Sequence, residues 1–137
     1  GHQHIHQLPV IRDALVELYR ERLMEKRPYI RVPSNPWRKT LRELIAYPKL
    51  AIIAVLGGFV LRARLERFNI PHNHYFSGAY TFSPSADYPQ LFPRFLRQAG
   101  ADGIIMCHPA KPSPQTPNTP LAHCRVNEFE YLRKMRP

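Results

Sequence analysis

The chain has 137 residues, 44% of them hydrophobic, which suits one globular domain and excludes a disordered tail. Two cysteines cannot build a disulfide framework, and no basic segment followed by an apolar one opens the sequence, so we expect reduced thiols and a cytoplasmic location. The net charge of +10 is regional, because residues 20–67 hold twelve Lys or Arg against four Glu.

The first third of the chain predicts two strands and two helices. Residues 1–7 alternate residue types with a period of two, which is typical of a strand. Apolar residues recur near helical spacing after Pro9, and this helix should end near residues 26–28, since a proline disfavours helical geometry in the residue before it. Residues 29–33 predict a second strand, and residues 37–47 predict an amphipathic helix.

An uninterrupted apolar run covers residues 50–61 and is closed by Arg62 and Arg64. Twelve residues are too few to cross a bilayer, which needs about 20. Two interpretations remain for this run. It is either a buried or crossover helix, or an amphipathic element that rests on a membrane or covers an apolar ligand.

The second half of the chain predicts further alternation of strand and helix. Residues 72–82 are rich in aromatic and turn residues, which suits a short strand and a loop. Residues 83–87 have the composition of a helix start, and residues 100–103 carry the glycines expected at the end of that helix.

The apolar run at residues 103–108, halted by Pro109, predicts a buried parallel strand with a polar residue at its end. A proline-rich loop follows at residues 111–120, and residues 121–135 predict a closing helix. Its expected core face consists of Val126, Phe129 and Leu132. The whole order therefore predicts an α/β chain with a parallel sheet.

The N-terminal histidines His2, His4 and His6 would project from one face of an extended chain, spaced about 7 Å per two residues. Adjacent members could then serve one metal ion, or one metal ion and its substrate, and imidazole suits zinc and other borderline metals. The alternative is that a His-rich N-terminus is the remnant of an affinity tag.

Three further residues could carry chemistry. His108 ends an apolar strand and suits general acid or base work, although a histidine bonded to a backbone carbonyl would look the same in sequence. Cys107 points to the opposite face of that strand, which favours a core cysteine over a nucleophile. Arg31 lies in an apolar strand and needs a partner, either a polar or anionic substrate or a structural carboxylate.

Four blocks of the sequence stand out by their order and spacing. They are His2-Gln-His-Ile-His-Gln-Leu-Pro9, Arg27-Pro-Tyr-Ile-Arg-Val-Pro33, Tyr75-Phe-Ser-Gly-Ala-Tyr80 and Met106-Cys-His-Pro109. Together they resemble the YdjC-like carbohydrate deacetylases, the group that includes chitooligosaccharide deacetylase and the hopanoid-biosynthesis-associated HpnK proteins. Details between residues 69 and 110 look closest to the hopanoid-associated branch.

The resemblance implies a (β/α)-barrel-like fold that hydrolyses an N-acetyl group on an amino sugar or sugar-lipid with a divalent metal ion, Mg or Zn. It gives three kinds of role to residues of this chain. His108 is implied as the catalytic histidine, His2 and His4 as metal ligands, and His6, Arg31 and Tyr80 as substrate-binding residues.

The chain departs from the family pattern in two respects. Family members open with a strand that carries an Asp-Asp motif, which supplies a metal ligand and the base, and a second metal histidine follows before the strand with the three histidines. These 137 residues contain neither feature, since the first acidic residue is Asp13, inside the first predicted helix, and the first histidine is His2. A barrel of this type has about 250 residues. We therefore expect residues 1–137 to be one partial domain, the C-terminal half of a barrel, inactive alone and prone to associate through its open sheet edges.

Two alternatives without catalysis remain: a basic module that binds a membrane surface, or one that binds nucleic acid. The sequence pI of 10.1 fits both. No recognised nucleic-acid motif is present, so we expect no nucleic-acid partner, whereas a membrane surface and a homo-oligomer stay open.

Overall fold

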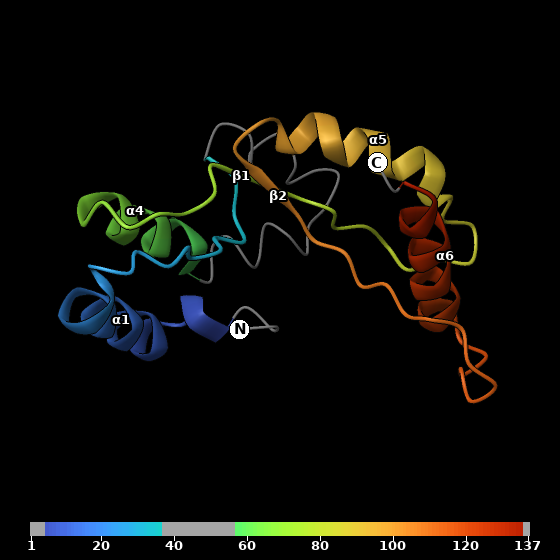
Figure 1. Cartoon of the computed structure of the whole chain (residues 1–137), viewed down its shortest axis with the longest axis horizontal. Coiled ribbons are helices and arrows are strands. Elements are labelled where there is room, and N and C mark those ends of the chain that lie inside the picture. Colours follow the sequence, from blue (N-terminus) through green and yellow to red (C-terminus); the bar gives the residue numbers. More distant parts are fainter. Residues whose placement is uncertain (1–4, 37–56, 136–137) are drawn as a thin grey trace. The chain divides into compact units, whose positions relative to one another are not determined.

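The computed structural model describes residues 5–36 and 57–135, and the chain divides into two compact units (Figure 1). The first unit holds Gly1–Phe76 with Ala101–Ile104, and the second holds Ser77–Gly100 with Ile105–Pro137. The described elements mix helices and strands, as predicted. In chain order they are η1 (Ile5–Gln7), α1 (Pro9–Leu18), η2 (Tyr19–Leu23), α4 (Phe59–Arg67), β1 (Tyr75–Ser77), α5 (Tyr88–Ala99), β2 (Gly103–Ile105) and α6 (Pro120–Lys134).

Of the strand predicted for residues 1–7, only residues 5–7 lie within the described residues, and there the prediction is wrong. Ile5–Gln7 forms a turn of 3₁₀ helix, closed by a 3.0 Å hydrogen bond from the Leu8 N–H to the Ile5 carbonyl. Pro9 begins α1 immediately afterwards, where its fixed φ suits a first helical turn. These residues therefore form the helical turn that leads into α1, although their sequence alternates with the period of a strand.

The helix that starts at Pro9 ends where the sequence predicts. It passes from α1 into the π-helical turns of η2, and Arg27 then adopts a positive φ of 43°. The Arg27 N–H still donates to the Leu23 carbonyl at 2.8 Å, so the helical hydrogen bonds continue up to that reversal.

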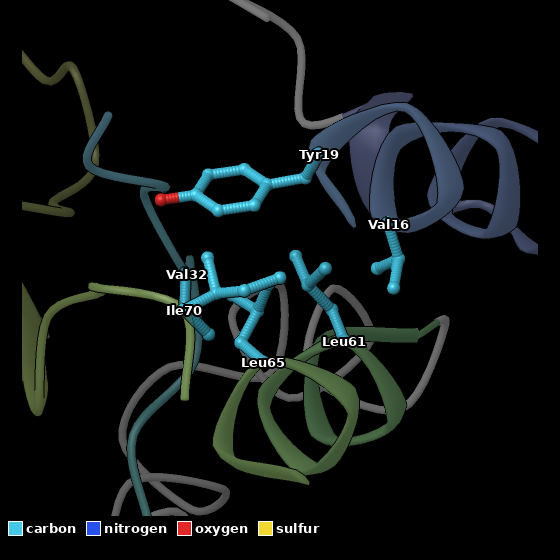
Figure 2. Close-up of a cluster of buried hydrophobic side chains, with 6 residues drawn as sticks. All are labelled: Val16, Tyr19, Val32, Leu61, Leu65 and Ile70. Carbon is cyan, nitrogen blue, oxygen red and sulfur yellow. The ribbon is translucent and has the colours of Figure 1, made fainter. Parts of the chain in front are cut away.

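A hydrophobic core joins α1, η2 and α4 in the first unit (Figure 2). Leu61 and Leu65 of α4 are fully buried, and the Tyr19 hydroxyl donates to the Pro28 carbonyl at 3.0 Å. The described end of the apolar run therefore belongs to a helix with one buried face, since Leu61 is fully buried while Val60 is 46% exposed. The members of this core are Val16, Tyr19, Val32, Leu61, Leu65 and Ile70.

The arginine that follows the apolar run, Arg62, lies inside α4 and is 7% exposed. Residues 50–56, and the helix predicted for residues 37–47, lie outside the described residues. Within the described residues, no helix is both long and apolar enough to span a membrane.

The strand predicted for residues 29–33 is replaced by an extended segment with one bridge. Ile30 pairs in parallel with His72, and two asparagine side chains continue the pairing. The Asn73 amide bonds both the N–H (2.6 Å) and the carbonyl (2.8 Å) of Val32. The Asn35 amide does the same for Phe76, at 2.8 and 3.0 Å. Side-chain amides therefore supply the bonds that a neighbouring strand would make.

The described strands β1 and β2 form a two-stranded sheet with parallel register. The Tyr75 N–H donates to the Asp102 carbonyl, and farther along both strands the Met106 N–H donates to the Ser77 carbonyl at 2.9 Å. The parallel strand predicted near residue 103 is confirmed, but its burial is not, because all three residues of β2 are half-buried. Gly78 follows β1 with a φ of 91°.

A second core packs α5 against α6 in the second unit, around Tyr88, Phe92 and Phe95. Asp87 caps α5 by accepting from the Gln90 N–H, as the sequence predicts for residues 83–87. The predicted core face of α6 is confirmed at Leu132, which packs against this core. Val126 and Phe129 are only half-buried, and the buried positions of the helix are Cys124 and Glu128.

Candidate functional site

His108 lies three residues beyond β2, and α6 holds its backbone on both sides. Its N–H donates to Glu128 Oε2 at 2.5 Å, and its carbonyl accepts from Arg125 Nε at 3.0 Å. The Ala110 N–H then donates to the Arg125 carbonyl at 2.9 Å. The loop that carries His108 is therefore fixed to one helix at three successive points.

Tyr80 reaches the same carboxylate from the loop after β1. Its hydroxyl donates to Glu128 Oε1 at 2.7 Å, and Glu128 is 0% exposed. One buried carboxylate on α6 thus joins two of the residues that the sequence assigns to the site, His108 and Tyr80.

Aromatic rings border the half-buried His108 imidazole. The Phe82 ring meets it edge to face, with 5.7 Å between centroids and an interplanar angle of 81°. Tyr80 lies 4.8 Å from Phe82, centroid to centroid. Flat apolar rings beside a polar imidazole can contact the C–H face of a sugar while the imidazole contacts its polar groups.

Burial governs the acid–base behaviour of the neighbouring groups. Desolvation raises the pKa of Tyr80, with a further contribution from its hydrogen bond to Glu128. Desolvation also raises the pKa of Tyr88, whose hydroxyl donates to Cys107 Sγ at 3.3 Å. Burial raises the pKa of the Cys107 and Cys124 thiols as well. Cys107 packs against the second core, in agreement with its interpretation as a core cysteine.

His6 and Arg31 meet in the first unit, but through the backbone of Arg31 and not its guanidinium. His6 Nε2 lies 2.8 Å from the Arg31 carbonyl oxygen. A carbonyl can only accept, so Nε2 carries the proton and Nδ1 keeps its lone pair. That Nδ1 atom is buried and has no hydrogen-bond partner among the described residues. Burial lowers the pKa of His6, and the bond to the Arg31 carbonyl opposes this shift.

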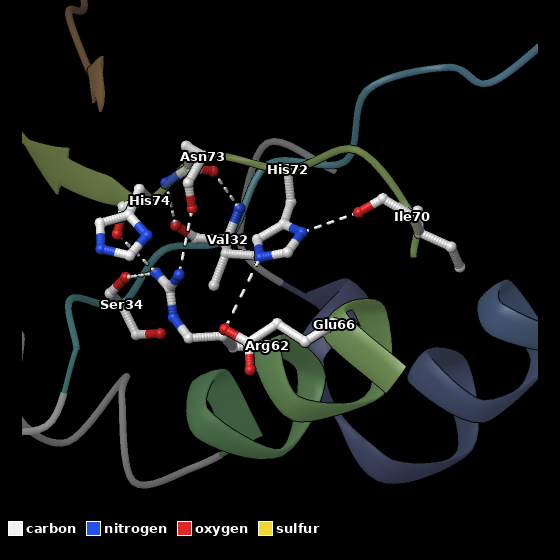
Figure 3. A network of polar contacts seen from close by, with 8 residues as sticks. All are labelled: Val32, Ser34, Arg62, Glu66, Ile70, His72, Asn73 and His74. Atoms are coloured by element: carbon white, nitrogen blue, oxygen red, sulfur yellow. Dashed lines mark hydrogen bonds and ion pairs between the residues drawn. The ribbon is translucent and has the colours of Figure 1, made fainter. Parts of the chain in front are cut away.

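Arg62 forms a polar network that sequence reasoning missed (Figure 3). Its guanidinium donates to the carbonyls of Ser34 (2.6 Å), Asn73 (3.2 Å) and His74 (3.0 Å). Burial lowers the pKa of this guanidinium. The network fixes the segment that leads into β1. Its only sequence signal is an arginine at the end of an apolar run.

The implied metal site is described only at His6, because His2 and His4 lie outside the described residues. Within residues 5–36 and 57–135, no three His, Cys, Asp or Glu side chains cluster as a set of ligands. His6 nevertheless fits a metal ligand. Metal-binding histidines typically donate one ring N–H to a carbonyl and present the other nitrogen's lone pair, which is the arrangement of its buried Nδ1.

Comparison with known proteins gives one family. Residues 1–136 match a family model described as "YdjC-like protein". Neither a curated protein nor a solved structure matches the chain.

Proposed function

Because the chain belongs to the YdjC-like family, we propose that it takes part in hydrolysing the N-acetyl group of an amino sugar or sugar-lipid, as a member of the hopanoid-biosynthesis-associated branch. The family itself indicates a hydrolase of the carbohydrate deacetylase type. The observation that carries the proposal is the family match over residues 1–136, which includes every block of the motif pattern.

His108 is proposed as the general acid of this reaction. Amide hydrolysis expels an amine, and an alkyl amine leaves readily only when its nitrogen gains a proton. A protonated imidazole can supply that proton, and the backbone of His108 is held at both its N–H and its carbonyl. Tyr80 and Arg31 are proposed to contact the substrate, and the phenol proton of Tyr80 is already committed to Glu128.

A divalent ion, Mg or Zn, is proposed to be held by His2 and His4, with His6 beside them. When bound, such an ion polarises the amide oxygen and lowers the pKa of its water. The buried lone pair at His6 Nδ1 supports this assignment, and it allows His6 to serve as a ligand as well as a substrate contact. The Arg31 carbonyl fixes the orientation of the His6 ring through Nε2.

These 137 residues contain no Asp-Asp motif, which in the family supplies a metal ligand and the base. We therefore propose that the chain forms part of a (β/α)-barrel whose activity needs that motif, and that these residues alone do not turn over substrate. Its described elements, two parallel strands with helices after each, are compatible with one sector of such a barrel.

The test is acetate release from N-acetylated chitooligosaccharides and from an N-acetylglucosaminyl lipid. We expect no release by the chain alone. We expect metal-dependent release, abolished by a chelator, when the chain is joined in one polypeptide behind a family segment that carries the Asp-Asp strand. A correctly folded joined protein that releases acetate from neither substrate, in Mg²⁺ or Zn²⁺, would refute the proposed function.

A second candidate function, binding to an anionic membrane surface, is favoured by the outer face of α1. Three of its apolar residues are exposed: Val10 by 81%, Leu18 by 44% and Ile11 by 42%. Apolar side chains at this spacing can enter a lipid interface, and the net charge of +10 would favour anionic headgroups. Val10→Asp should then reduce co-sedimentation with phosphatidylserine vesicles, and unchanged co-sedimentation would exclude α1 as the contact.

A further inference from the structure

We propose that Glu128 is a positioning residue for the reaction, which orients His108 and Tyr80 together through the two oxygens of one buried carboxylate. This inference rests on the proposed function. Each oxygen has one donor: the Tyr80 hydroxyl at Oε1 (2.7 Å) and the His108 N–H at Oε2 (2.5 Å). The two donors come from different loops, one after β1 and one after β2.

The position of Glu128 in α6 is unusual for a residue with only a folding role. Among the described residues it is 0% exposed and takes part in no ion pair. A carboxylate removed from water without a cation is costly unless its oxygens are hydrogen-bonded, and an apolar side chain would fill the same helix face at lower cost. The two hydrogen bonds are what distinguishes glutamate from leucine at this position.

The same helix turn completes the attachment of His108. Arg125 lies three residues before Glu128 and donates from Nε to the His108 carbonyl. The two peptide groups that flank the His108 side chain are therefore both held by α6, and Pro109 follows with its fixed φ. With the backbone fixed and the Phe82 ring packed at 81° to the imidazole, the position from which the imidazole acts is defined. Misplacing a reacting group by about 1 Å can reduce a rate about 100-fold.

The test compares Glu128→Leu with Glu130→Leu. Leucine is close to glutamate in size but has no acceptor oxygen, so the Tyr80 hydroxyl and the His108 N–H both lose their partner. Glu130 is the matched control, because it lies on the same helix and pairs only with Arg133 among the described residues, at 2.6 Å. Tyr80→Phe removes only the Tyr80 donor and leaves the His108 bond in place.

Amide hydrogen exchange on the 137-residue chain measures the geometry without any activity. Protection of the His108 amide should fall about 10- to 100-fold in Glu128→Leu and stay unchanged in Glu130→Leu. Kinetics on the joined, active protein measure the role in the reaction. At an assay temperature well below the melting temperature of the variant, kcat should fall about 10- to 100-fold with little change in KM. The fall should be smaller for an aryl amide, because an aryl amine needs less protonation to leave.

The outcomes separate the two proposals. Reduced His108 protection with normal kcat in Glu128→Leu would overturn the positioning role and leave the proposed function standing. Unchanged His108 protection in this variant would overturn the attachment itself. A joined protein with no activity refutes the proposed function and the catalytic part of this inference, while the exchange result still decides whether Glu128 fixes the loop. If Glu128→Leu does not fold, Tyr80→Phe answers the question, with a smaller fall in kcat expected and an unchanged kcat counting against the joint orientation.

Discussion

Removal of the Asn73 amide should be among the most destabilising single changes in the first unit. Asn73 is 0% exposed and makes three hydrogen bonds: from the Val32 N–H to Oδ1 at 2.6 Å, and from Nδ2 to the carbonyls of Val32 (2.8 Å) and Tyr75 (2.9 Å). Val32 is itself 0% exposed, so water cannot replace the partners that its backbone would lose.

The magnitude follows from those three bonds. A buried hydrogen bond contributes about 1 kcal/mol, and leaving a buried partner unsatisfied costs about 1–3 kcal/mol. Asn73→Ala should therefore lower the free energy of unfolding by about 3 kcal/mol or more. Asn118→Ala is the control, since Asn118 is exposed and bonds only His123 Nε2 among the described residues, at 2.8 Å; its effect should stay within about 0.5 kcal/mol.

Urea denaturation followed by circular dichroism measures both variants, and amide exchange at Val32 locates the loss. Asn73→Asp keeps the size and shape of the side chain and changes only its hydrogen-bonding groups. The acceptor for the Val32 N–H remains, but a carboxylate oxygen replaces the NH₂ group and faces the carbonyl oxygens of Val32 and Tyr75. This substitution should be at least as destabilising as alanine. A loss below about 1 kcal/mol for Asn73→Ala, or unchanged protection of the Val32 amide, would refute the claim that this side chain replaces a strand neighbour.

Three further predictions concern the second unit. Gly78→Ala should lower the free energy of unfolding by about 2 kcal/mol or more, because a Cβ would lie 2.7 Å from Met106 N and closer still to the Met106 carbonyl oxygen. Gly100 is the control, since it also has a positive φ but has open space where its Cβ would lie. Gly100→Ala should therefore cost less in the same denaturation assay. Alkylation of Cys107 by iodoacetamide at neutral pH should be at least about tenfold slower in the folded than in the urea-unfolded chain, because burial raises its pKa and leaves less thiolate; equal rates by mass spectrometry would contradict this. His108→Gln in the joined protein should lower acetate release about 10²- to 10⁴-fold with metal binding retained, and an equal loss on alkyl and aryl amides with a lowered melting temperature would instead indicate a structural histidine.

The sequence predicts the elements that depend on local signals. The proline at position 9 marks the start of α1, Asp87 marks the start of α5, and the basic, proline-bounded stretch at residues 26–28 marks the end of the first helix. In each case the deciding interaction lies within a few residues of the signal. The same holds for the parallel strand at residues 103–105, where a continuous apolar run is read directly from the sequence.

The failures occur where the partner is distant in sequence. Residues 29–33 have strand-like composition, yet the bonds of Val32 go to an asparagine 41 positions away. The core face of α6 was predicted from apolar residues alone. The periodicity of apolar residues does not reveal that Glu128 is buried, because its hydrogen-bond donors are Tyr80 and His108, far away in the sequence. Arg62 follows the same rule, because its three acceptors are carbonyls at positions 34, 73 and 74.

The motif resemblance identified more residues of the candidate site than the periodicity of apolar residues did. It selected His108 and Tyr80, which the structure joins through Glu128, and His6 and Arg31, which the structure joins through a carbonyl. It did not select Glu128, because the motif blocks end at Pro109 and the glutamate stands in a helix whose pattern suggested only packing. The roles of these residues in catalysis remain predictions, and those of His2 and His4 concern residues outside the described part of the chain.

A common device supports the segments that carry these residues. In the first unit, Asn73 and Asn35 satisfy the backbone of Val32 and Phe76, and in the second unit Glu128 satisfies the backbone of His108. A strand ladder holds a segment through every second residue and leaves it straight. A single buried side chain instead holds the backbone of one residue and lets the chain bend on either side. That freedom suits a loop whose side chains must converge on a ligand. It also makes each segment depend on one residue, which is why we expect single substitutions at Asn73 and Glu128 to have large and local effects that a change within a regular strand would not produce.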